Sequence, residues 1–168
     1  MTPTAYWLIN VRLETAYHYD NGTVTGTKTA LFNVLIENGR IKQIISGDQP
    51  LETDLPKRDA RSYLMLPAFR DMHIHIDKTY FGGPWKAPSI PTEGLITRLK
   101  EEEVLLPSLL PVAEERAKKL LDLLLHAGTT HIRTHCNIDP FIGLKNLEAV
   151  LRAKEAFQNK VALEIVAF

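Results

Sequence analysis

A regular alternation of strand and helix patterns in the last hundred residues is the feature that most constrains the fold. The strand patterns cover residues 70–77, 130–137 and 161–168, and the helical patterns cover residues 95–106, 113–126 and 144–158. Consecutive strands separated by helices and short connections are typical of parallel βαβ units. The sequence therefore predicts an α/β fold, whose parallel sheet either opens into a doubly wound fold or closes into a barrel.

The helical patterns differ in strength. Residues 95–106 mix charges with apolar side chains and predict a short helix. Residues 113–126 predict a stronger helix, because Leu120, Leu121, Leu124 and Leu125 form an apolar stripe at helical spacing. Gly128 follows where a C-terminal cap is expected.

Residues 1–62 have a different character and predict a small sheet built from hairpins. Apolar and β-branched side chains dominate residues 7–13, 32–37 and 41–45. Asn21-Gly22 and Asn38-Gly39 supply the residues that tight hairpin turns prefer. Residues 49–62 are polar and contain proline, so we expect a linker or crossover there and a second domain over residues 63–168.

Composition excludes several classes of function. The chain has 20 Lys and Arg against 20 Asp and Glu, so its zero formal charge favours neither nucleic acid nor an anionic membrane as a partner. No segment approaches the roughly 20 apolar residues that span a bilayer. Cys136 is the single cysteine and cannot form an internal disulfide. We expect a cytoplasmic protein.

The chemistry is concentrated in His73-Ile74-His75. Residues two apart in a strand point to the same face, so both imidazoles would project together and could grip one divalent ion. Asp77 continues that face as a metal ligand, an acceptor for a histidine N–H or a substrate contact. The motif lies at the C-terminal end of its strand, where active sites of parallel α/β folds form. A bare His-x-His also occurs by chance.

Four blocks together resemble the amidohydrolase superfamily, in particular its cytosine-deaminase-like branch, which includes N-alkylammelide amidohydrolases. The blocks are residues 34–44, 66–78, 127–135 and 163–168. The resemblance implies the first part of a (β/α)₈ barrel, a small β-sandwich built from both chain ends, and one zinc or iron ion that activates water to attack a ring carbon. It assigns His73 and His75 as metal ligands. Ala68 and Arg70 depart from the family pattern, which usually has glycine and an apolar residue there.

The same resemblance places the remaining ligands and the proton-shuttling glutamate beyond residue 168. We therefore expect no catalytic residue within this chain, which by itself would be an inactive N-terminal part of a deaminase. The alternative is a non-catalytic product: a truncated or split gene, or a degenerate paralogue. The expected partners are a small heterocyclic substrate in the complete enzyme and a complementing chain or a second copy.

Other polar side chains near the motif each allow more than one role. His135 shares a strand face with His131 and Arg133, and either contacts substrate or belongs to an interior hydrogen-bond network. Arg133 is expected to form an ion pair with Glu164. Lys78 either contacts substrate or closes an ion pair. Asp77, Lys78 and His135 are thus the substrate-binding candidates.

Overall fold

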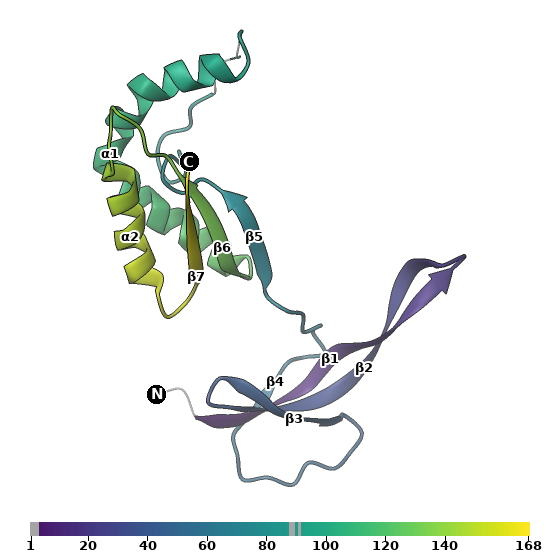
Figure 1. Cartoon of the computed structure of the whole chain (residues 1–168). Helices are drawn as coiled ribbons and strands as arrows, with labels where there is room; N and C mark the ends of the chain where they lie inside the picture. The colour runs from purple at the N-terminus through teal and green to yellow at the C-terminus, as the bar shows by residue number, and fades with distance from the viewer. Residues whose placement is uncertain (1–3, 88–89, 91) are drawn as a thin grey trace. The chain divides into compact units, whose positions relative to one another are not determined.

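The computed structural model describes residues 4–87, 90 and 92–168, and it divides the chain into two compact units. The first unit extends to Pro67 and the second comprises Ala68–Phe168. Each unit contains its own sheet (Figure 1). The division comes shortly after Tyr63, where the sequence pattern changes.

The first unit is a four-stranded sheet with the strand order β3-β2-β1-β4. The strands are β1 (Ala5–Asp20), β2 (Thr23–Glu37), β3 (Arg40–Ser46) and β4 (Lys57–Asp59). β1, β2 and β3 pair antiparallel, as expected of consecutive hairpins, and Val11 and Val34 are fully buried. The described residues of this unit form one sheet, and the second sheet of a sandwich stays a prediction.

Both predicted Asn-Gly turns are confirmed. Asn21 and Gly22 have φ values of 46° and 80°, and Asn38 and Gly39 have values of 51° and 73°. Two successive residues at positive φ define the type I′ turn, whose twist matches that of the flanking strands. The turns therefore fix where β1 ends, where β2 begins and ends, and where β3 begins.

The prediction of a linker over residues 49–62 was wrong in part, because β4 lies inside it. β4 pairs parallel with β1, with Trp7 opposite Lys57 and Ile9 opposite Asp59. The Trp7 amide also donates to the carbonyl of Pro56. Without β4, the edge of β1 that faces away from β2 would lack hydrogen-bond partners. A short polar segment can supply them without apolar side chains of its own.

The second unit is a parallel α/β layer, as the alternating pattern predicted. It contains β5 (Phe69–Ile74), α1 (Leu95–His126), β6 (Thr129–Cys136), α2 (Lys145–Phe157) and β7 (Ala162–Ala167). The sheet order is β5-β6-β7, and both pairings are parallel. α1 and α2 contact each other and β6 (Figure 1). Closure of this sheet into a barrel stays a proposal.

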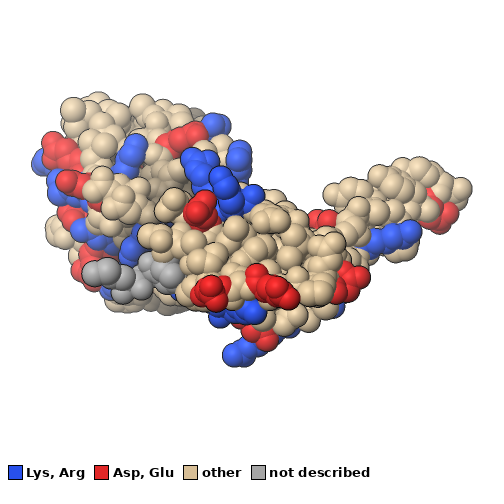
Figure 2. Space-filling view, turned by 90° about the horizontal axis from the view of Figure 1, so that it is seen from below, with Lys and Arg blue, Asp and Glu red and all other residues tan. Residues whose placement is uncertain are grey.

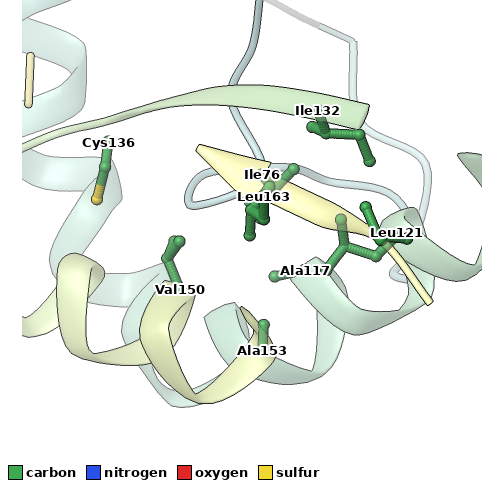
Figure 3. Close-up of a cluster of buried hydrophobic side chains, with 9 residues drawn as sticks. Ile76, Ala117, Leu121, Ile132, Cys136, Val150, Ala153 and Leu163 are labelled. Atoms are coloured by element: carbon green, nitrogen blue, oxygen red, sulfur yellow. The ribbon is translucent and has the colours of Figure 1, made fainter. Parts of the chain in front are cut away.

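The core of the second unit lies between the sheet and the helices. Ile76, Leu121, Ile132 and Val150 are fully buried in one cluster that Figure 3 shows with side chains from strands and from both helices. Ile74 packs against the same cluster. The isoleucines of the His-x-His segment therefore face the helices, as the sequence predicted, and this anchors the backbone that carries the histidines.

Two predicted helices are one in the structure. α1 continues through Pro107 and Pro111, although proline removes a helical hydrogen bond and clashes with the preceding turn. Leu106, Leu109 and Ala113 are buried on the same helix across this region, so burial of a continuous apolar face outweighs the local cost. α1 changes direction along its length in Figure 1, as prolines inside a helix commonly cause.

Charged side chains of both signs lie on the face of the molecule that Figure 2 shows. No described helix has the length and apolarity to cross a bilayer. Figure 2 shows Lys and Arg side chains interspersed with Asp and Glu on the displayed face. This mixture agrees with the balanced composition of the chain.

Candidate metal centre

Three histidines from two adjacent strands converge at the C-terminal ends of β5 and β6. They are His73 in β5, His75 directly after it and His135 in β6. Each offers one ring nitrogen, and these three atoms lie within 4.8 Å of one another. Neutral imidazole nitrogens at such mutual distances can hold one transition-metal ion.

The rings are arranged as a shallow, open cluster. The ring of His73 stacks on that of His135, with centroids 4.2 Å apart, and the ring of His75 lies 5.9 Å from the first and 5.6 Å from the second. His73 is exposed, whereas His75 and His135 are half-buried. One side of the cluster therefore stays accessible to water or a small ligand.

The chain leaves regular β structure within the motif, so the prediction that the strand continues to Asp77 was wrong. β5 ends at Ile74, and its pairing with β6 is irregular between Asp71 and Ile74. The amide of Ile76 donates to the hydroxyl of Thr134 at 3.1 Å instead of to a strand carbonyl. This buried side-chain contact bends the segment away from the sheet ladder and sets the position of His75.

The environment of His75 favours the neutral ring that a metal requires. Burial lowers the pKa of His75, the nearby Lys78 lowers it further, and Asp77 opposes them. The Nδ1 atoms of His75 and His135 are buried and have no hydrogen-bond partner. Three imidazoles whose ring nitrogens converge fit the donor set of a divalent metal site.

Asp77 lies beside His75 and is 1% exposed. Its Oδ2 accepts hydrogen bonds from the Asn137 amide at 2.8 Å and from the Asn146 side chain at 3.1 Å. Its Oδ1 is 3.7 Å from Nδ1 of His75. The structure therefore places this carboxylate next to His75 and encloses it in protein.

Lys78 closes an ion pair, one of the two roles that the sequence left open. Its Nζ lies 2.5 Å from Oε1 of Glu102 in α1, and Oε2 of Glu102 accepts a hydrogen bond from Nδ2 of Asn137 at 2.9 Å. The ammonium also lies 5.6 Å from the ring centroid of Phe168. Direct contact of Lys78 with substrate stays a prediction.

The predicted ion pair of Arg133 and Glu164 is confirmed and includes a third group. Nε of Arg133 lies 2.8 Å from one oxygen of Glu164, and Nε2 of His131 lies 2.7 Å from the other. Arg133 and then His131 lower the pKa of Glu164 through these hydrogen bonds. Of the three polar residues on this face of β6, only His135 joins the histidine cluster.

Several residues that support the site are not indicated by any sequence motif. Glu102 lies in α1 and pairs with Lys78 and Asn137. Asn146 is 1% exposed and lies among the buried apolar positions of α2. A polar residue in an apolar helix stripe is the signal that could have identified it. Asp139 accepts hydrogen bonds from the amides of Phe141 and Ile142 in the turn before α2.

Lys78 also lines a cavity of about 780 Å³, and none of the three histidines is among the lining residues. Its walls come from the loop after β5 and from the first half of α1, and they include Tyr80, Lys86, Glu102 and Leu105. The lining combines apolar surface with both signs of charge. Such a cavity has room for a small heterocycle, since ligand pockets commonly measure about 300–1,000 Å³.

Sequence comparison finds relatives that match most or all of the chain. The uncharacterized protein YahJ of Escherichia coli K12 is 44% identical over 100% of this chain and 37% of its own length. The N-isopropylammelide isopropyl amidohydrolase of Pseudomonas sp. strain ADP is 28% identical over 84% of this chain and 35% of its own length. The chain thus spans little more than a third of the curated relatives it matches. No protein-family model matches the sequence.

Comparison with solved structures also finds matches that cover nearly all of this chain. N-isopropylammelide isopropylaminohydrolase from Burkholderia multivorans matches with a TM-score of 0.76 and 28% identity, over 99% of this chain and 38% of that one. 5-Methylcytosine deaminase from Klebsiella pneumoniae, liganded with 5-fluorocytosine, matches with a TM-score of 0.69 and 29% identity, over 96% of this chain and 36% of that one.

Proposed function

Because the homologues and structural neighbours of this chain are amidohydrolase-family deaminases, we propose that it carries the metal-binding part of a hydrolase. The enzyme cleaves a C–N bond at a nitrogen heterocycle and releases ammonia or an amine. The observation that carries this proposal is the convergence of His73, His75 and His135 at the C-terminal ends of two parallel strands.

The residues of the cluster have distinct tasks in this proposal. His73 and His75 hold the ion, and the chemistry that the ion supplies is a bound water whose pKa falls toward ~7. His135 lies close enough to orient a ligand of the same centre or to bind the ion itself. The half-burial of His75 and His135 limits competing water on one side of the cluster.

The cavity beside Lys78 is the proposed binding place for the heterocycle. Its apolar wall can contact a flat ring, and its polar groups can contact ring nitrogens or exocyclic oxygens. Lys78 and His135 are the side chains that we propose to contact the substrate from this chain. The metal is zinc or iron, since imidazole ligands suit both ions.

A metal-binding experiment tests the proposed centre directly. The purified 168-residue chain is titrated with Co²⁺, whose visible absorption reports the ligand set and geometry. We expect one equivalent to bind, and His73→Ala and His75→Ala to remove the signal. His18→Ala is the matched control, because His18 is exposed and lies in β1 of the other unit. Absorption that is unchanged in both site variants would contradict the proposed ligands.

Turnover needs residues beyond those of the cluster in this proposal. The resemblance assigns further metal ligands and a proton-transferring glutamate to segments other than this one, which a longer chain or a complementing chain would supply. We therefore expect the 168-residue chain to bind metal without releasing ammonia from cytosine or related heterocycles. Metal-dependent ammonia release from the purified chain would contradict this expectation.

A further inference from the structure

Asp77 is held more firmly than a substrate contact requires. Its side chain is completely buried, and both of its hydrogen bonds reach one oxygen, Oδ2. One donor is the backbone amide of Asn137, directly after β6, and the other is the side chain of Asn146 in α2. Two separate segments thus fix the orientation of the carboxylate and leave Oδ1 facing in one direction.

That direction is toward His75. Oδ1 of Asp77 and Nδ1 of His75 lie 3.7 Å apart. In the part of the chain that the structure describes, four buried side-chain atoms lack a hydrogen-bond partner, and all four belong to this site: Nδ1 of His75, Oδ1 of Asp77, Nδ1 of His135 and Oδ1 of Asn137. Buried polar atoms without hydrogen-bond partners are rare in folded proteins. Two such atoms that face each other therefore indicate that the two side chains interact.

The chemistry of the two atoms decides the direction of the hydrogen bond. An ionised carboxylate can only accept, so the imidazole nitrogen that faces it must carry the proton. A displacement of about 1 Å brings the two atoms to ordinary hydrogen-bond distance. The proton on Nδ1 then leaves the lone pair of His75 on Nε2, which is the atom available to a metal ion.

We propose that Asp77 is a positioning residue that fixes the tautomer and ring orientation of His75. This inference rests on the proposed function, because His75 matters as a metal ligand only if the centre binds an ion. Asp77 acts through His75 and does not itself contact substrate. Carboxylates that accept the second N–H of a metal-binding histidine recur in protein metal sites, which gives the arrangement a chemical precedent.

The surrounding structure prevents Asp77 from turning elsewhere. Ile76, between the two residues, is buried in the core shown in Figure 3, and its amide is held by Thr134. Asn137 is held in turn by Glu102 of α1, which pairs with Lys78. The network thus holds the carboxylate of Asp77 directly from Asn137 and Asn146, with Glu102 supporting Asn137.

The first test needs no substitution. Long-range ¹H–¹⁵N correlation spectra of the metal-free chain, labelled with ¹⁵N-histidine, report which nitrogen of each ring carries the proton. We expect His75 to be protonated on Nδ1, with assignment from the spectrum of the His75→Ala variant. A His75 ring protonated predominantly on Nε2 would overturn the inference, whether or not the chain binds metal.

The second test measures zinc affinity by competition with a chromophoric chelator. Asp77→Asn keeps the size of the side chain and removes its charge, and we expect it to weaken zinc binding by roughly 10–100-fold and to lower the population of the Nδ1–H tautomer. The matched control is Asp122→Asn. Asp122 is exposed, and its Oδ2 lies 3.5 Å from Nδ1 of His126, a residue outside the histidine cluster. This control variant should keep the parental affinity.

The outcomes separate this inference from the proposed function. If the unsubstituted chain binds no zinc, the proposed metal centre fails, and the tautomer of His75 still decides the role of Asp77. If the chain binds zinc and Asp77→Asn binds it equally well, the centre stands and the positioning role is wrong. If Asp77→Asn does not fold, the spectrum of the unsubstituted chain gives the decision.

Discussion

Cys136 shows how strongly the fold modifies a single side chain next to the site. It is fully buried in the core of the second unit, and burial raises the pKa of its thiol to about 12, with a smaller contribution from Asp77. The thiolate is the reactive form of cysteine. A packing role therefore explains this residue better than a chemical one, although it directly follows His135 in the sequence.

This environment predicts an unreactive thiol. At about pH 8, near the pKa of a free cysteine, the folded chain should contain about a thousandfold less thiolate than an unperturbed cysteine would, given the pKa of about 12. Ellman's reagent should therefore label Cys136 only after denaturant unfolds the second unit. Labelling of the native chain at the rate of free cysteine would show that the thiol is accessible and that the core around it opens easily.

Glu164 supplies a prediction of pH dependence. Its pKa is lowered in the folded chain by Arg133 and then by His131, so the unfolded chain binds its proton at a higher pH than the folded chain does. The stability that Glu164 contributes is fully present above the pKa that Glu164 has in the unfolded chain. It is lost as the pH falls through the lower pKa of Glu164 in the folded chain. The free energy of unfolding of Glu164→Gln should thus vary less than that of the parent between about pH 5 and pH 3.

Denaturant unfolding at several pH values measures this difference. Glu155→Gln is a suitable control, because Glu155 is an exposed glutamate on α2, and its curve should run parallel to that of the parent. Equal pH dependence in the parent and in Glu164→Gln would mean that the ion pair of Arg133 contributes nothing to acid stability.

At the residue scale, the sequence predicted the polar groups that repeat along a strand but not those that complete the site from other elements. His73 and His75 share a two-residue period, and His135 could be placed on the inner face of its own strand by the same rule. Asn146 is 69 residues from Asp77 along the chain, and its hydrogen bond to Asp77 depends on how α2 packs. No local pattern encodes that distance.

The hairpin turns of the first unit are elements that the sequence specifies almost completely. Gly39 has a φ of 73°, and a Cβ atom added there would meet no atom within 4 Å. A substitution at this position therefore tests backbone conformation without steric clash. For an L-residue, the left-handed region costs about 1–2 kcal/mol.

Gly39→Ala should destabilise the first unit by about 1 kcal/mol. Trp7 is buried in the same sheet, so denaturant unfolding followed by its fluorescence measures the change. Gly26→Ala is the matched control: Gly26 lies within β2 at an ordinary φ, and an added Cβ would be 3.8 Å from His18. That variant should match the parent or exceed its stability. Equal losses at both positions would contradict the assignment of a type I′ turn.

α1 marks the limit of element prediction from local signals. Pro107 and Pro111 carry strong local preferences against a helix interior, and the two separate helices expected around them follow those preferences. The structure instead keeps one helix over 32 residues, because Leu106, Leu109 and Ala113 are buried along one continuous face. Whether this face of α1 is buried depends on the elements that pack against it. The sequence of the helix alone does not identify those elements.

At the scale of the whole molecule, the parallel order β5-β6-β7 explains why the histidine cluster forms at one end of the second unit. Parallel strands direct their C-terminal ends to the same edge, so residues from separate segments meet there without any local signal joining them. His75 and His135 are 60 positions apart and become neighbours by this rule. The functional prediction therefore depended mainly on the parallel arrangement of the strands.

The division into two units leads to a prediction about the whole chain. Each unit has its own sheet, and the histidine cluster lies entirely in the second. A ligand stabilises the folded state that binds it by RT ln(1 + [L]/Kd), which is about 2.7 kcal/mol at a hundredfold excess over Kd. Zinc should therefore stabilise the second unit and leave the first unchanged.

The two tryptophans allow each unit to be followed separately. Trp7 is buried in the first unit and Trp85 is exposed in the second, so Trp85→Phe leaves a fluorescence signal from the first unit alone. Both described helices lie in the second unit, so the helical band of the circular dichroism spectrum reports its unfolding. In this variant, zinc should raise the denaturation temperature seen by circular dichroism and leave the fluorescence transition in place. A parallel shift of both transitions would show that the units unfold together, and His75→Ala should remove either shift, because without that imidazole the second unit loses its preference for the ion.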